Sequence, residues 1–92
     1  VYRKVINFGA LPNAGDKIVA HGISKPYTTI SITGIASNGT LEIPLPHTYS
    51  PDNQYSIFVY INRTNNTVIV GEGVDRSAYN AYITIEYIKA NL

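Results

Sequence analysis

The ionisable side chains, where catalysis would have to reside, are few and scattered. The acids are Asp16, Glu42, Asp52, Glu72, Asp75 and Glu86. A glycosidase needs two carboxyl groups at a set separation, and no spacing here singles out such a pair. His21 and His47 fall in no zinc-ligand pattern, no serine lies in a G-x-S-x-G motif, and cysteine is absent. We therefore predict no catalytic residue, no metal site and no cofactor, and we interpret His21 as structural.

A loop at residues 46–53 has the composition of a shallow binding site. It brings His47, Tyr49, Asp52 and Asn53 close together in the sequence. An aromatic ring for stacking and a few fixed hydrogen-bonding groups are the usual components of a sugar site. We name these four residues as candidate ligand contacts, with an ordinary turn as the alternative for each of them.

The segment Asp75-Arg76-Ser77 allows two interpretations. In the first, the side chain of Asp75 or Ser77 accepts backbone N–H groups and Arg76 pairs with a carboxylate, which fixes the start of the last strand. In the second, Arg76 and Tyr79 project from a loop at one end of the sandwich and contact a ligand. The first interpretation is favoured, and Arg76 is kept as a candidate ligand contact.

Strands must position these loops, and the last one is the most regular. Tyr79, Ala81, Ile83, Ile85 and Tyr87 alternate with polar residues, which predicts a half-buried strand. Further strands are predicted at residues 2–8, 17–21, 27–36, 41–45, 54–62 and 67–70, with loops at 9–16 and 71–74. No window has helical periodicity. The fold class is therefore all-β: a small antiparallel β-sandwich or jelly-roll-like domain of about seven strands.

Three glycine and proline signals refine this prediction. Asn38-Gly39 predicts a hairpin with a type I′ turn, in which both residues have positive φ. Pro44 lacks an N–H group, so its strand should lie at an edge. Gly34 interrupts a β-rich run and indicates a bulge or a close backbone approach.

The predicted strand at 54–62 has large apolar side chains on both faces, Phe58 and Tyr60 lying opposite Ile57 and Val59. One face of an antiparallel sandwich should be polar and solvated. Either loops cover Phe58 and Tyr60, or these two residues meet another subunit. A chain of this size has a thin stability margin, so we favour the subunit interface.

Length and charge limit the partners. Ninety-two residues make one domain, and the net charge of +1 comes with scattered basic residues, which argues against nucleic acid. No apolar run approaches the ~20 residues of a membrane span, so membrane insertion is not expected. The chain starts at Val1 without a signal-peptide pattern, and we expect it to be a piece of a longer protein.

Several segments together carry a family resemblance. They are residues 4–13 (KVINFGALPN), 19–23 (VAHGI), 43–46 (IPLP), 75–79 (DRSAY) and 83–87 (ITIEY). The pattern resembles a C-terminal β module of tail-fibre and other receptor-binding virion structural proteins of tailed bacteriophages, over nearly the whole chain.

The resemblance implies a non-enzymatic virion module, made in the bacterial cytoplasm and trimeric as tail fibres are. It implies attachment to a bacterial surface glycan and contact with other virion proteins. A purely structural virion module (a fibre cap, trimerisation or capsid decoration domain) and a free-standing carbohydrate-binding module remain the alternatives.

Overall fold

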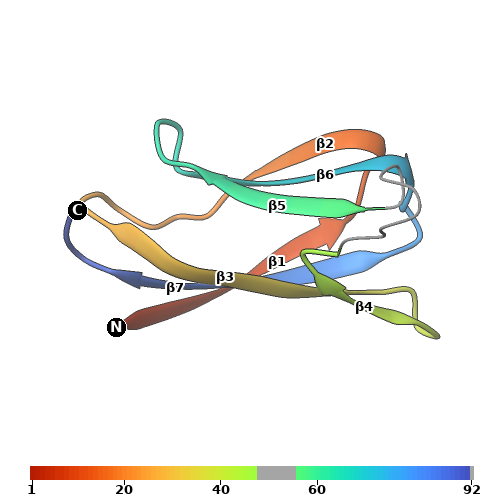
Figure 1. Cartoon of the computed structure of the whole chain (residues 1–92), viewed down its shortest axis with the longest axis horizontal. Helices are drawn as coiled ribbons and strands as arrows, with labels where there is room; N and C mark the ends of the chain where they lie inside the picture. The colour runs from red at the N-terminus through yellow and green to blue at the C-terminus, as the bar shows by residue number, and fades with distance from the viewer. Residues whose placement is uncertain (48–55, 92) are drawn as a thin grey trace.

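The computed structural model describes residues 1–47 and 56–91, and within them it forms a two-layered antiparallel β-sandwich without helices (Figure 1). The strands are β1 (Tyr2–Ala10), β2 (Asn13–Ala20), β3 (Thr28–Ser37), β4 (Glu42–Leu45), β5 (Ile57–Asn62), β6 (Thr67–Asp75) and β7 (Asn80–Ile88). Sheet A has the strand order β1-β7-β3-β4, and sheet B the order β2-β6-β5. The predicted all-β sandwich is confirmed.

The strand pairing is nested. The first strand pairs with the last, β1 with β7, and the second strand pairs with the one before the last, β2 with β6. The chain between them supplies β3 and β4 to sheet A and β5 to sheet B. This nesting of outer pairs around inner ones resembles a jelly roll.

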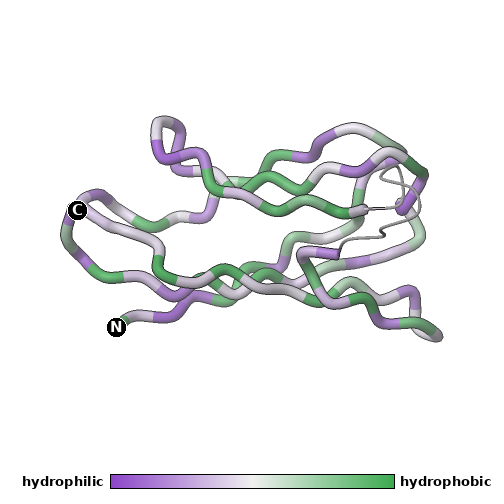
Figure 2. The backbone as a smooth tube through the Cα atoms, viewed as in Figure 1, coloured by the Kyte–Doolittle hydropathy of each residue, from purple (hydrophilic) through white to green (hydrophobic). Residues whose placement is uncertain are grey.

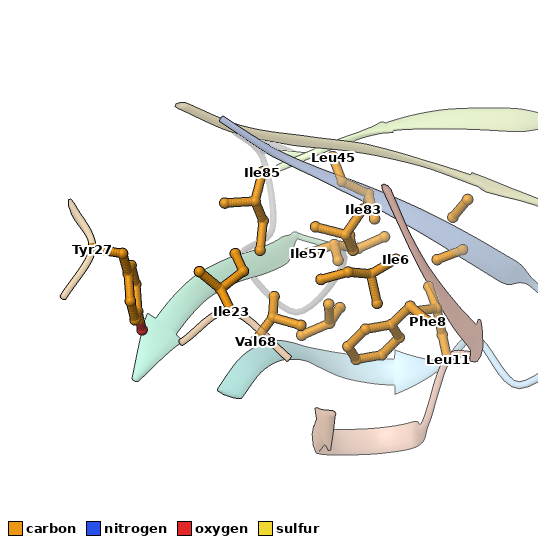
Figure 3. Packing of buried hydrophobic residues seen from close by; sticks show 13 residues of the cluster. Ile6, Phe8, Leu11, Ile23, Tyr27, Leu45, Ile57, Val68, Ile83 and Ile85 are labelled. Atoms are coloured by element: carbon orange, nitrogen blue, oxygen red, sulfur yellow. The ribbon is translucent and has the colours of Figure 1, made fainter. Parts of the chain in front are cut away.

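The core lies between the two sheets, and β7 is at its centre (Figure 3). Ala81, Ile83 and Ile85 are fully buried, as the alternation predicted, and they face Val68 and Val70 of β6. Burying one such aliphatic side chain contributes roughly 1.5–3 kcal/mol. The inner faces of the sheets therefore supply most of the driving force for folding.

The predicted loop at residues 9–16 is wrong, because most of it is strand. β1 continues to Ala10 and β2 already begins at Asn13. Gly9 and Gly15 have φ of 81° and 80°, and each lies where the ladder shifts register. A β-bulge tolerates a residue with positive φ without ending the strand, which is why loop-like composition occurs inside two strands here.

The second predicted connection, 71–74, is also strand, since β6 runs on to Asp75. The hairpin at Asn38-Gly39 is confirmed, but its turn type is wrong. Of the two residues only Gly39 has positive φ. Asn38 Oδ1 instead accepts the N–H groups of Thr40 and Leu41, at 2.9 and 2.8 Å. The local side-chain bonds favour a four-residue loop over the two-residue turn.

The expectations for Pro44 and Gly34 are confirmed. Pro44 lies in β4, the edge strand of sheet A. A Cβ at Gly34 would lie 2.7 Å from Ile83 Cδ1 and 2.7 Å from Tyr82 O, so the backbones approach closely there. The register shift of β3 falls elsewhere, between Thr29 and Ser31.

Candidate functional site

Of the four loop residues predicted to contact a ligand, only His47 lies within the described residues. It is half-buried and forms an isolated bridge with Ile57, through N–H···O contacts of 3.0 and 2.7 Å in the two directions. His47 therefore lies alongside the first residue of β5, where it adds a single bridge to the edge of sheet B. Tyr49, Asp52 and Asn53 lie outside the described residues.

Arg76 lies in the tight turn between β6 and β7. Its backbone N–H donates to Pro12 O at 3.1 Å, and its carbonyl accepts from Tyr79 N at 2.9 Å. Its guanidinium stands 5.7 Å from the centre of the Tyr79 ring. Ser77 N donates to Asp75 Oδ1 at 2.8 Å, and hydrogen bonds from Ser77 lower the pKa of Asp75. The hydrogen bond that Asp75 accepts is the one expected in the structural interpretation of the corner.

The outer face of sheet B is apolar. Phe58 and Tyr60 project from β5 with 57% and 48% of their surface exposed. In the register of the sheet, Tyr60 is opposite Ile69 of β6, which is in turn opposite Ile18 of β2. Figure 2 shows hydrophobic residues along both β5 and β6. We call the outer surface formed by Ile18, Phe58, Tyr60 and Ile69 the sheet B face.

The sheet B face is continuous across all three strands. Ile69 is only 5% exposed because Ile18 and Tyr60 flank it, while Ile18 itself is 61% exposed. Beside them, the Asp16 carboxylate lies over Gly71, in the space where a Cβ would be, next to Phe58 in the register. The surface is thus an apolar patch with a carboxylate at its border. Contiguous exposed apolar patches rimmed by polar groups are typical of interaction sites.

Sequence reasoning named Phe58 and Tyr60 but missed Ile18 and Ile69. The signal for Ile69 was the all-apolar run Val68-Ile69-Val70, in which one residue must face away from the core. Ile18 could be placed only once β2 was known to pair with β6.

One carboxylate faces inward. Glu72 is opposite Ile57, a core residue, and is only 6% exposed. Neither of its oxygens has a hydrogen-bond partner among the described residues. Burial raises the pKa of Glu72 to about 7, an effect that the positive charge of Arg76 opposes and the negative charge of Asp75 reinforces. A lone buried carboxylate of this kind is a cost to folding when it is ionised.

His21 is a structural residue, as expected. It is 1% exposed, and its Nδ1 accepts the N–H of Ile23 at 3.0 Å. Nε2 therefore carries the proton and donates to the hydroxyl of Tyr27 at 2.9 Å. Burial and the charge of Lys4 lower the pKa of His21. Arg63 completes the cluster by donating to Tyr27 O at 2.8 Å.

Tyr27→Phe is expected to destabilise the protein by about 1–2 kcal/mol, because it leaves the buried Nε2–H of His21 without its acceptor. Urea unfolding at pH 7.5 measures the difference. Tyr82→Phe is the matched control, since the Tyr82 side chain is 55% exposed and its change should stay within about 0.5 kcal/mol. Equal effects of the two changes would contradict the assigned role of the His21–Tyr27 bond.

Residues 1–47 and 56–91 enclose no pocket and hold no group of three or more potential metal ligands. Over the same residues no helix is long and apolar enough to cross a membrane.

Comparison with known proteins gives no neighbour. No family model matches the sequence, and no curated protein or solved structure matches the chain. The sheet B face, the other surfaces of the sandwich and the sequence pattern are therefore the features that bear on function.

Proposed function

We propose that the chain is a non-catalytic module of a bacteriophage tail fibre, which assembles as a homotrimer in the virion and takes part in attachment to a bacterial surface glycan. The observation that carries the proposal is the sheet B face, with Phe58 and Tyr60 about half exposed beside Ile18 and Ile69. The resemblance of five sequence segments to tail-fibre modules supplies the virion context and the number of subunits.

An apolar sheet face supports assembly better than it supports catalysis. Burying exposed apolar surface contributes about 25 cal/mol per Å². A domain of this length buries a smaller fraction of its surface on folding than a larger domain does, so burial against identical chains adds apolar contacts that the monomer lacks. The carboxylate of Asp16 at the border of the patch is suited to a polar rim.

The segments that carry the resemblance support a scaffold role. Leu11, His21, Ile23 and Leu45 are each at most 5% exposed. Arg76 belongs to the turn that leads into β7. Buried residues and turns maintain the scaffold, so ligand contacts are expected from the loops and the outer faces of the sheets.

A purely structural virion module is the second candidate. The observation that favours it is the lack of a pocket among the described residues. Such a module would keep the sheet B face as its interface and would have no glycan ligand of its own.

Binding of the fluorescently labelled chain to a panel of bacterial strains separates the two candidates. The attachment module is expected to label some strains, and periodate oxidation of the cell-surface glycans is expected to abolish the label. A chain that labels no strain in the panel, while remaining trimeric, would contradict attachment and favour the structural module.

A further inference from the structure

The outer face of sheet A differs in chemistry from the sheet B face. One row across four strands contains Asn7, Tyr82, Ile35 and Pro44, in the order β1-β7-β3-β4. The next row contains Val5, Thr84 and Thr33. Tyr82, Ile35 and Val5 are 55%, 43% and 58% exposed. We call these two rows the sheet A face.

Tyr82 differs from most aromatic residues of the fold. Tyr2 and Tyr87 stack on one another, Tyr27 contacts His21, and both Phe8 and Tyr79 lie beneath a cation. Among the described residues, Tyr82 has no such ring or cation contact, and it shares this condition with Phe58 and Tyr60 alone. Phe58 and Tyr60 lie together on the apolar sheet B face, whereas Tyr82 is the one aromatic residue of its two rows, flanked by Asn7 and Ile35 and next to Thr84.

The sheet A face is electrically neutral. Arg3 and Glu86 form an ion pair of 3.7 Å one row beyond Val5 and Thr84, and Glu42 lies one row beyond Tyr82 at the other end. Between them the two rows hold only amide, hydroxyl, aliphatic and aromatic side chains. A neutral ligand would lose least on binding here, because no charge has to be desolvated.

We propose that the sheet A face binds a neutral, extended glycan chain, with the Tyr82 ring stacking on a sugar ring and Asn7, Thr33 and Thr84 exchanging hydrogen bonds with sugar hydroxyls. This inference rests on the proposed attachment function and places its ligand on the sheet opposite the subunit interface. This binding site is separate from the candidate loop at residues 46–53.

The geometry favours a polymer over a small molecule. The described residues enclose no pocket, so a ligand must lie along a surface. Strands lie about 4.8 Å apart, so the polar groups of the two rows, from Asn7 on β1 to Thr33 on β3, span about 10 Å across the sheet. One aromatic ring and several neutral polar groups on a flat surface can contact successive sugars of a glycan chain. They do not surround a single sugar.

The test is a titration of the ¹⁵N-labelled chain with neutral gluco-, manno- and galacto-hexasaccharides, followed by NMR. At least one of them is expected to shift the amide signals of Asn7, Thr33, Tyr82 and Thr84. Tyr82→Ala is expected to weaken this binding by about tenfold, the effect of losing one stacked ring. Tyr82→Phe, which keeps the ring, should bind within about twofold of the unmodified chain. Leu41→Ala, an equally exposed change in the β3–β4 loop, is the control for the surface as a whole.

Three outcomes would overturn the inference: no hexasaccharide binds, the shifted signals lie on sheet B or at His47, or Tyr82→Ala binds as well as the unmodified chain. The cell-binding assay then separates this failure from that of the proposed function. If Tyr82→Ala labels the same strains as strongly as the unmodified chain, attachment stands and the sheet A face is the wrong site. If the unmodified chain labels no strain, attachment itself is contradicted.

Discussion

Phe58→Asp is expected to separate the assembly into monomers. The change places a carboxylate on the sheet B face, where Phe58 lies beside Tyr60 on β5 and in the same row as Gly71 and the carboxylate of Asp16. Burying this new charge against a second copy would cost several kcal/mol without a partner of opposite charge. Light scattering after size-exclusion chromatography, at about 50 µM protein, measures the mass of each variant.

Leu41→Asp is the matched control for this experiment. Leu41 is 59% exposed, against 57% for Phe58, but it lies in the loop between β3 and β4. It should leave the mass unchanged. Tyr60→Asp, a second change on the sheet B face, should act as Phe58→Asp does, and circular dichroism should show that both variants keep their β structure. Loss of assembly in Leu41→Asp, or its retention in both face variants, would count against the interface.

Glu72→Gln is expected to stabilise the protein at pH 8 and to have little effect near pH 4.5. Burial raises the pKa of Glu72 from 4.5 to about 7, so the folded state holds a proton that the unfolded state has released between these values. The contribution of Glu72 to stability is therefore fully present below pH 4.5 and is lost as the pH rises through 7. A shift from 4.5 to about 7 corresponds to about 3 kcal/mol at pH 8, which lies above both values.

The pH profile of urea unfolding, measured for both proteins at one fixed concentration, checks this expectation. His21 acts in the opposite direction. Its lowered pKa makes the folded state lose stability as the pH falls below 6.5. Because both proteins contain His21, the difference between the two profiles isolates Glu72. Glu42→Gln, at an exposed carboxylate, should show no such gain. A Glu72→Gln protein less stable than the unmodified one at pH 8 would mean that Arg76 or another group pairs with the carboxylate.

The sequence predicted the strands with the clearest alternation. Ile83 and Ile85 of β7 were expected in the core and are fully buried there. Pro44 was expected at an edge and Gly34 at a close approach of the backbone, and both expectations are confirmed. In each case one local property, such as period two, a missing N–H group or a missing Cβ, determines the position by itself.

The errors arose where pairing between distant segments overrides local composition. Gly9 and Gly15 lie in a segment of loop-like composition, but each is at a bulge inside a strand, because β7 and β6 continue the ladder past it. Glu72 follows a glycine and precedes another, so its sequence neighbourhood resembles a connection. Only the pairing of Glu72 with Ile57 places its carboxylate on the inner face.

The candidate surfaces could be predicted only in part, because they too depend on pairing between segments that are distant in the sequence. Phe58 and Tyr60 share a face of one strand, and a sequence shows this directly. Ile18 and Ile69 join them only through the order β2-β6-β5. The row of Asn7, Tyr82 and Ile35 spans three strands that are far apart in the sequence, so no local pattern reveals it.

Sedimentation equilibrium of the unmodified chain tests the central claim most directly, which is that identical chains assemble through the sheet B face. We expect a species of about 30 kDa, three times the 10.1 kDa of one chain, at micromolar concentration. A dimer would contradict the expected number of subunits, but assembly through the sheet B face could still be tested with Phe58→Asp. A monomer at every concentration up to about 100 µM would contradict the account, since Phe58, Tyr60 and Ile18 would then have no identical partner to cover them.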